Sequence, residues 1–300
     1  MRRRRLSRRT IRENIAGYLF LLPWLAGFLA WLAIPMGVSI YLSFTRYNLF
    51  KPPVWQGLVN YRELLLDELV LKSLANTSYY TFIGVPIYTV VALGVAVLLN
   101  QKVRGISIFR TIYYLPAIVP AVAGTLIWMW IFNPDFGLAN MLLKGLGLPP
   151  QRWLYDIQQA KAVLIFMSIW AMGPTMVLFL AALQNVPKEL TEAAYIDGAN
   201  AWQRFVHVTF PMISPVTFLN MINGFIASFQ IFTPAYIATS GGPANATLFY
   251  VLYLFRVAIQ YLDFGFAAAM AWLLFFIILV LTLLQIYLSR RWVYYEVAPD

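Results

Sequence analysis

Hydrophobic residues gather along the 300-residue chain in runs long enough to cross a lipid bilayer. A helix that crosses the hydrocarbon core needs about 20 mostly apolar residues. Six runs meet this length, and polar segments that carry most of the charges separate them. The predicted spans are 15–44, 77–99, 112–132, 162–183, 212–232 and 264–288. The pattern therefore predicts an all-α membrane protein with six transmembrane helices.

The composition agrees with a polytopic membrane protein. Hydrophobic residues make up 61% of the chain and charged residues 11%, against roughly 25% charged in a soluble domain. Seven arginines lie in the first fourteen residues, and the apolar run that follows is longer than the roughly 7–15 residues of a signal-peptide core. The first run is therefore predicted to be an uncleaved span.

The distribution of Lys and Arg predicts the orientation. Most of the 22 basic residues lie in the N-terminal segment, in the loops after the second and fourth spans, and in the C-terminal tail. Excess positive charge marks the cytoplasmic side, so both termini are expected in the cytoplasm. The predicted organisation is a basic N-terminus at 1–14, a first helix with an outside loop at 15–72, a transmembrane domain at 73–288 and a tail at 289–300.

Several local features refine this prediction. Pro116 and Pro120 should bend the third span, because each removes a backbone donor. A short helix is predicted near 61–71 in the first outside loop. The apolar stretch 248–261 is too short to span and carries Arg256, so it is interpreted as an interfacial or re-entrant helix.

The sequence offers little catalytic chemistry. It has no cysteine, one histidine and no phosphate-binding G-x-x-x-x-G-K-[ST] loop, so it is not expected to be an enzyme or to hydrolyse ATP. No metal site is expected, and none of the twelve acids falls inside a predicted span. Ion-coupled carriers commonly place an ionisable group at membrane depth. A secondary transporter or channel for a neutral solute is thus the less favoured alternative, and a membrane-embedded enzyme is third.

A substrate path without charges must use neutral polar groups and aromatic rings. The fifth span is the most polar, and its candidate substrate contacts are Asn220, Asn223, Ser228 and Gln230. Candidate stacking platforms for a sugar ring are Trp128, Trp130, Trp170, Tyr236 and Trp272. The alternative is that the amides bond neighbouring helices and that the tryptophans form interfacial belts.

The polar segment 187–215 has specific turn chemistry. Pro187 suits a first helical turn, and Gly198 can take the left-handed conformation that ends a helix. Asn200 is a predicted N-cap with Gln203 three residues on, and Pro211 is expected to stop the second short helix. The prediction is two short helices separated by a glycine break at the membrane surface.

This segment resembles the cytoplasmic EAA loop of ABC importer permeases, whose pattern is Glu-Ala-Ala, three residues, Gly, and a later apolar-Pro pair. Here the pattern is Glu192-Ala193-Ala194, Gly198 and Phe210-Pro211, and Gly241-Gly242-Pro243-Ala244-Asn245 is similar to the carbohydrate-uptake branch. The resemblance implies the type I ABC importer fold. It also implies an ATPase-coupling loop at 187–211, with coupling residues Glu192, Ala193, Ala194, Asp197, Gly198, Arg204 and Pro211.

The resemblance further implies an assembly in a bacterial or archaeal plasma membrane. Its partners would be a second homologous permease, two ATPase subunits that hold ATP and Mg, and an extracytoplasmic solute-binding protein. This chain itself would carry no cofactor and bind no nucleic acid. The implied substrate is a sugar or a related polar uncharged solute, moved by alternating access.

Overall fold

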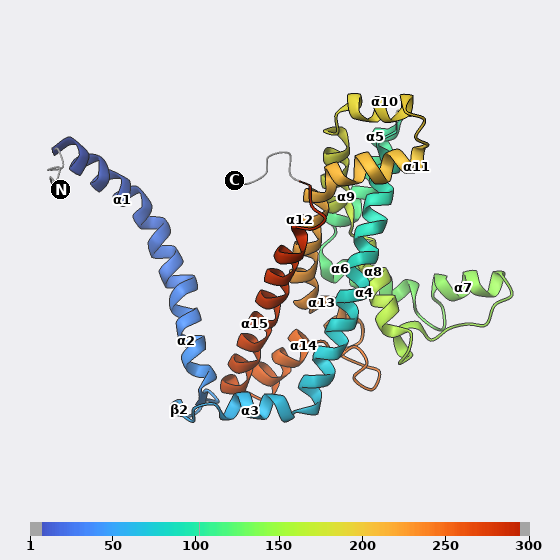
Figure 1. Cartoon of the computed structure of the whole chain (residues 1–300). Helices are drawn as coiled ribbons and strands as arrows, with labels where there is room; N and C mark the ends of the chain where they lie inside the picture. Colours follow the sequence, from blue (N-terminus) through green and yellow to red (C-terminus); the bar gives the residue numbers. More distant parts are fainter. Residues whose placement is uncertain (1–7, 102, 295–300) are drawn as a thin grey trace. The chain divides into compact units, whose positions relative to one another are not determined.

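The computed structural model describes residues 8–101 and 103–294, which form helices and one short hairpin (Figure 1). The predicted basic segment 1–14 and the end of the tail lie partly outside these residues. The chain divides into two compact units, one of residues 1–66 with 257–273 and one of residues 67–256 with 274–300. Each unit is described by itself.

The first unit begins with a long apolar helix. The helix consists of α1 (Arg8–Phe28), a π-helical turn η1 (Leu29–Ala33) and α2 (Ile34–Ser43). Its segment Ala16–Ser43 is a candidate membrane span. In the most hydrophobic part of this segment, no residue is buried against the described residues. Pro35 lies in the first turn of α2, where its missing N–H is tolerated. The helix predicted for the first span is confirmed.

A small hairpin follows that the hydrophobic pattern did not predict. β1 (Thr45–Arg46) pairs antiparallel with β2 (Val54–Trp55), and α3 (Val59–Leu66) comes next. The buried Asn60 Nδ2 donates to the carbonyls of Ser43 at 2.8 Å and Thr45 at 3.0 Å. Such short strands depend on contacts with residues elsewhere in the sequence, so no periodicity of hydrophobic residues predicts them.

The second span starts earlier than predicted. α4 (Glu68–Leu99) begins directly after Asp67, whose Oδ1 accepts from the backbone N–H groups of Leu69 at 2.7 Å and Val70 at 3.0 Å. The short helix predicted near 61–71 is present as α3, but it ends at Leu66, because the N-cap at Asp67 starts α4.

At two further predicted spans the structure has a bent pair of helices. α5 (Ile106–Tyr114) with the 3₁₀ turn η2 (Leu115–Ile118) meets α6 (Ala121–Ile131) at 102°, which confirms the bend predicted at Pro116 and Pro120. α8 (Ala160–Ile169) meets α9 (Gly173–Gln184) at 50°, a break that was not predicted. Four helices in the described part are long and apolar enough to span a membrane, or up to six if each bent pair is one span.

The remaining elements complete the second unit and its connections. The segment between α6 and α8 contains α7 (Leu138–Gly145) and η3 (Trp153–Tyr155). After α9 come α10 (Lys188–Ile196), α11 (Ala201–Arg204), a π-helical turn η4 (Phe205–Thr209), α12 (Phe210–Phe229), α13 (Thr233–Ala238), α14 (Tyr250–Phe255), η5 (Arg256–Gln260) and α15 (Phe264–Ser289). α14 with η5 confirms a short apolar helix in the stretch 248–261, and α15 confirms the helix of the last predicted span.

The core of the second unit forms where α4, α9 and α12 pack together. Ala92 and Ala96 of α4 are fully buried against Met176 and Phe179 of α9 and Ile213 of α12. Small residues on one helix let its neighbours approach closely, as is common among membrane helices. This packing fixes the helices that carry the polar residues described next.

Candidate functional site

A cavity of about 480 Å³, here called the amide chamber, lies among α4, α8, α9, α12 and α13. It contains three of the four residues predicted on the fifth span: Asn220, Asn223 and Ser228. The chamber is lined by Tyr80, Gly84, Val85, Tyr88, Ala121, Ser168, Thr175, Asn220, Asn223, Gly224, Ala227, Ser228, Ile231, Phe232, Thr233 and Pro234. None of these described lining residues carries a charge.

Asn220 is the most constrained polar group of the amide chamber. Its side chain is 8% exposed, and its buried Nδ2 has no hydrogen-bond partner among the described residues. A buried donor left unpaired costs about 1–3 kcal/mol, so such groups are normally satisfied by water or by a ligand. This amide can therefore supply a hydrogen bond to a molecule inside the chamber.

The amide chamber also contains several hydroxyl groups. Ser228 Oγ donates to Thr81 Oγ1 at 2.8 Å, and Tyr88 Oη lies 3.2 Å from Thr175 Oγ1. Tyr80 and Ser168 add two more hydroxyls to the lining. Of these groups, sequence reasoning predicted only Ser228 and missed the others. Hydroxyl residues are visible in the second and fourth spans, but the sequence does not show that those faces meet the fifth span.

Gln230 lies elsewhere. It is the C-cap residue of α12, it is exposed, and it does not line the amide chamber. Gly224, which shares its helix face with Asn220 and Asn223, allows close helix packing, since a Cβ there would lie 2.9 Å from Val85 Cγ1 on α4. The glycine thus lets α12 and α4 come close beside the chamber.

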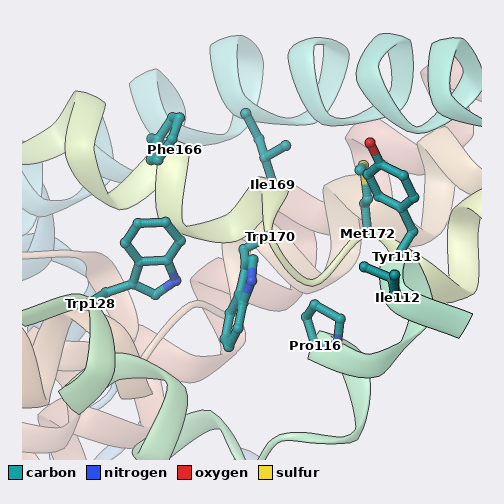
Figure 2. A pocket seen from close by; sticks show the side chains of 8 residues that line it. All are labelled: Ile112, Tyr113, Pro116, Trp128, Phe166, Ile169, Trp170 and Met172. Atoms are coloured by element: carbon teal, nitrogen blue, oxygen red, sulfur yellow. The ribbon is translucent and has the colours of Figure 1, made fainter. Parts of the chain in front are cut away.

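A second cavity, here called the tryptophan pocket, opens between the two bent helix pairs, α5–α6 and α8–α9. It has a volume of about 280 Å³ and is lined by Ile112, Tyr113, Pro116, Trp128, Phe166, Ile169, Trp170 and Met172. Figure 2 shows Trp128 and Trp170 side by side with their rings perpendicular, the centroids 5.8 Å apart, and Pro116 on the other side of Trp170. Two of the five candidate stacking platforms therefore share one pocket.

The predicted coupling loop lies at the end of the second unit where α9 ends and α12 begins (Figure 1). Pro187 directly precedes α10 as its N-cap residue rather than lying in the first turn. Gly198 has φ +82°, as predicted. Its N–H donates to Tyr195 O at 3.1 Å, and Ala199 N–H donates to Ala194 O at 3.0 Å. These two bonds form the Schellman motif that ends a helix at a left-handed residue.

The helix after the glycine break is capped as predicted but does not end as predicted. Asn200 and Gln203 exchange two hydrogen bonds of 2.9 Å, a complete capping box. Pro211 does not stop the helix, because η4 leads directly into α12 and Pro211 lies in the first turn of α12. The π-helical turn accommodates the missing N–H, so this prediction was wrong.

The surface of the coupling loop combines charge with apolar side chains. Arg204 stabilises the turn between α10 and α11. Its Nη1 donates to Ala199 O at 3.3 Å, and its guanidinium lies 5.0 Å from the centre of the Tyr195 ring. Glu192 is exposed, and so are Ile196 at 84% and Trp202 at 71%. An apolar surface of this kind is typical of a protein–protein interface.

Comparison with known proteins decides the family. The model of the family described as "Binding-protein-dependent transport system inner membrane component" matches residues 88–294, which include the amide chamber's α12 and the whole coupling loop. The chain belongs to this family of transport permeases. The assignment confirms the resemblance carried by Glu192-Ala193-Ala194 and Gly198, and it makes the chain a multi-pass membrane protein.

Relatives in this permease family cover nearly the whole chain. The probable ABC transporter permease YesP of Bacillus subtilis is 43% identical over 97% of this chain and 95% of its own length. The arabinooligosaccharide permease AraP of Halalkalibacterium halodurans is 35% identical over 92% and 88%. A bacterial alginate ABC transporter, solved with an alginate pentasaccharide-bound periplasmic protein, matches with a TM-score of 0.83 at 22% identity, over 94% of this chain and 96% of that chain. The last match shows the shared fold alone.

Proposed function

We propose that this chain is a permease subunit of an ATP-driven ABC importer that moves an uncharged sugar or oligosaccharide into the cell. The amide chamber carries the proposal, because it combines several hydroxyls with a buried amide, Asn220 Nδ2, that has no partner among the described residues, within the fold of a transport permease. The names of relatives, such as the arabinooligosaccharide permease and a trehalose/maltose permease that is 32% identical, agree with a carbohydrate substrate.

The chemistry of the amide chamber suits a carbohydrate. Sugar hydroxyls both donate and accept hydrogen bonds, and so do amides and hydroxyl side chains. Asn220, Asn223 and Ser228 can hold such hydroxyls, while Val85 and Phe232 contact the apolar faces of the ring. An anionic substrate would meet no Lys or Arg in this lining, so the proposal specifies an uncharged solute.

The proposed transport mechanism is alternating access driven from outside this chain. Two ATPase subunits would hold ATP and Mg, a second homologous permease would complete the pathway, and a solute-binding protein would deliver the sugar. Closure of the ATPases would move the coupling loop, and α12 would carry that motion to the chamber, because the helical run from Ala201 through η4 to Phe229 is continuous.

The docking surface for the ATPase is proposed on α10 and α11. Glu192 supplies a charge, and the exposed Ile196 and Trp202 supply apolar area for a groove. A buried aromatic anchor surrounded by polar contacts is the usual composition of a strong interface. Glu192, Ala193, Ala194, Asp197, Gly198, Arg204 and Pro211 remain the proposed coupling residues.

Cysteine labelling tests the proposed orientation, with six spans and both termini in the cytoplasm. Asp135→Cys and Ala201→Cys introduce single thiols at exposed positions of a cysteine-free chain. An impermeant maleimide should label whole cells at position 135, and it should reach position 201 only after the membrane is permeabilised. Labelling of both positions in intact cells would contradict this topology. The unsubstituted chain gives the background.

Transport by the reconstituted assembly tests the function itself. Proteoliposomes that contain this permease with its partners should take up an uncharged oligosaccharide when ATP is the only energy source.

A further inference from the structure

The base of α12 is a weak point in the helix that leads from the coupling loop to the amide chamber. The π-helical turn η4, Pro211 and Pro215 all fall within residues 205–215. Each proline removes a backbone N–H, and helices bend most readily at prolines and π-helical turns. A movement of the coupling loop would be absorbed by bending here unless neighbouring groups stiffen the segment.

A buried serine replaces one of the missing backbone bonds. Pro215 lacks the N–H that would bond the carbonyl of Pro211, four residues earlier. Ser214 Oγ donates to this carbonyl instead, at 2.6 Å. The Ser214 side chain is fully buried. Since a hydroxyl oxygen also accepts hydrogen bonds, Ser214 can take a donor from another part of the chain.

The C-terminal tail supplies this donor. The backbone N–H of Tyr294 donates to Ser214 Oγ at 2.9 Å, and the end of α15, from which the tail continues, lies beside the beginning of α12 (Figure 1). Hydrogen bonds in such a chain polarise and strengthen one another. The tail is therefore linked through Ser214 to Pro211, which is one of the proposed coupling residues.

A ring contact one turn along α12 gives the tail a second attachment. Phe218 lies four residues after Ser214 and therefore on the same face of the helix. The Trp292 ring meets the Phe218 ring edge to face, with the centroids 6.0 Å apart and the planes at 83°, which is a favourable arrangement. The tail thus contacts α12 at two points that lie on either side of Pro215.

The tail is itself fixed to the end of α15. The backbone N–H groups of Trp292 and Val293 donate to the carbonyl of Ser289, the last residue of α15, at 3.1 and 2.8 Å. On another face of the same segment of α12, Ile213 is fully buried in the core that includes Met176 of α9. The base of α12 is therefore held by α9 on one face and by the tail on another.

We infer that Trp292 and Tyr294 are positioning residues that stiffen the base of α12, so that a movement of the coupling loop reaches the amide chamber instead of bending the helix. This inference rests on the proposed function. Both residues act through Ser214 and Phe218. Their contacts fall on the part of α12 that the prolines weaken, which is where stiffening affects transmission most.

The test measures the ATP hydrolysed per sugar taken up by the assembled transporter in proteoliposomes, with maltose and arabinose oligosaccharides as probes. Trp292→Ala removes the ring contact. It should lower the maximal rate of uptake about fivefold and change ATP hydrolysis less than about twofold, so that more ATP is used per sugar. The KM for the sugar should stay at the wild-type value, because the amide chamber is intact. Trp292→Phe keeps an aromatic ring and should retain most of the coupling.

A cross-linked variant tests the same contact from both sides. Phe218→Cys/Trp292→Cys places two thiols in a cysteine-free chain, at positions whose rings are in contact. Without a cross-link, the variant should use as much ATP per sugar as Trp292→Ala. Joining the two thiols with a short bis-maleimide attaches the tail to α12 again, and it should return the ratio to within about twofold of wild type.

Tyr287→Ala is the matched control, because it removes an aromatic ring that is 61% exposed on α15, before the tail begins. It should leave both rates unchanged. Uptake and ATP hydrolysis that fall in the same proportion in Trp292→Ala would give the tail a purely structural role and overturn the inference. Unchanged coupling in Trp292→Ala, uncoupling by Tyr287→Ala, or uncoupling that persists after cross-linking would also overturn it, and each would leave the proposed function standing. If the wild-type transporter takes up none of the probes with ATP as the only energy source, the proposed function fails and the inference with it.

Discussion

Gly198→Val and Glu192→Lys should each abolish carbohydrate uptake while the permease still inserts into the membrane. Gly198 has φ +82°, and a residue with a Cβ loses about 1–2 kcal/mol in this conformation. Apart from the adjoining residues, no described atom lies within 4 Å of a Cβ at this position, so valine acts through the backbone alone. The altered turn misplaces α10 relative to α11. Lysine at 192 reverses an exposed charge in the proposed interface, where a mismatch costs several kcal/mol.

The measurement is uptake in cells together with retention of the ATPase subunits during purification. Gly198→Asn is the matched control for the glycine, because asparagine tolerates the left-handed region, and it should keep most of the uptake. Normal uptake by both Gly198→Val and Glu192→Lys, with the ATPase retained, would show that 187–211 is not the coupling loop.

Asn220→Leu and Asn223→Leu should each lower uptake at least about tenfold, because each removes a hydrogen bond to the substrate. Leucine has the same number and branching of side-chain heavy atoms as asparagine. At position 220 it replaces a buried amide whose Nδ2 is unpartnered among the described residues, so thermal stability should stay level or rise. A purely structural amide would give the opposite result, with stability lost along with transport.

Gln230→Leu is the control for the amide chamber, since Gln230 is exposed at the end of the same helix and outside the lining. It should transport at close to the wild-type rate. Wild-type uptake by the Asn220→Leu/Asn223→Leu double variant would show that the substrate contacts lie on other helices.

The sequence predicted the membrane elements well where the residues of a single helix determine its structure. The runs that became most of α4, α12 and α15 are predominantly apolar and long enough to span, and the glycine break at Gly198 and the capping box at Asn200 depend only on neighbouring residues. Local chemistry was less reliable for proline. Pro116 and Pro120 do accompany a sharp bend, but Pro211 is absorbed by a π-helical turn that the sequence does not announce.

The candidate site could be predicted only on the helix that carries most of its amides. The spacing of Asn220 and Asn223 indicates a shared polar face, and the structure places both in the amide chamber. The opposite wall requires Tyr88 and Thr175 to meet from two other helices, which follows from tertiary packing. Trp128 and Trp170 were recognised as aromatic candidates, but only the bends of α5–α6 and α8–α9 bring them to one pocket.

ATP-driven uptake in proteoliposomes is the most direct test of the proposed function. The assembly should contain this permease, its partner permease, the ATPase subunits and the binding protein, with ATP and Mg on the ATPase side and no ion gradient. An uncharged oligosaccharide should accumulate against its concentration gradient, and the accumulation should stop when ATP is replaced by a nonhydrolysable analogue. Uptake that needs a proton or sodium gradient but no ATP, or uptake restricted to acidic oligouronides, would contradict the account.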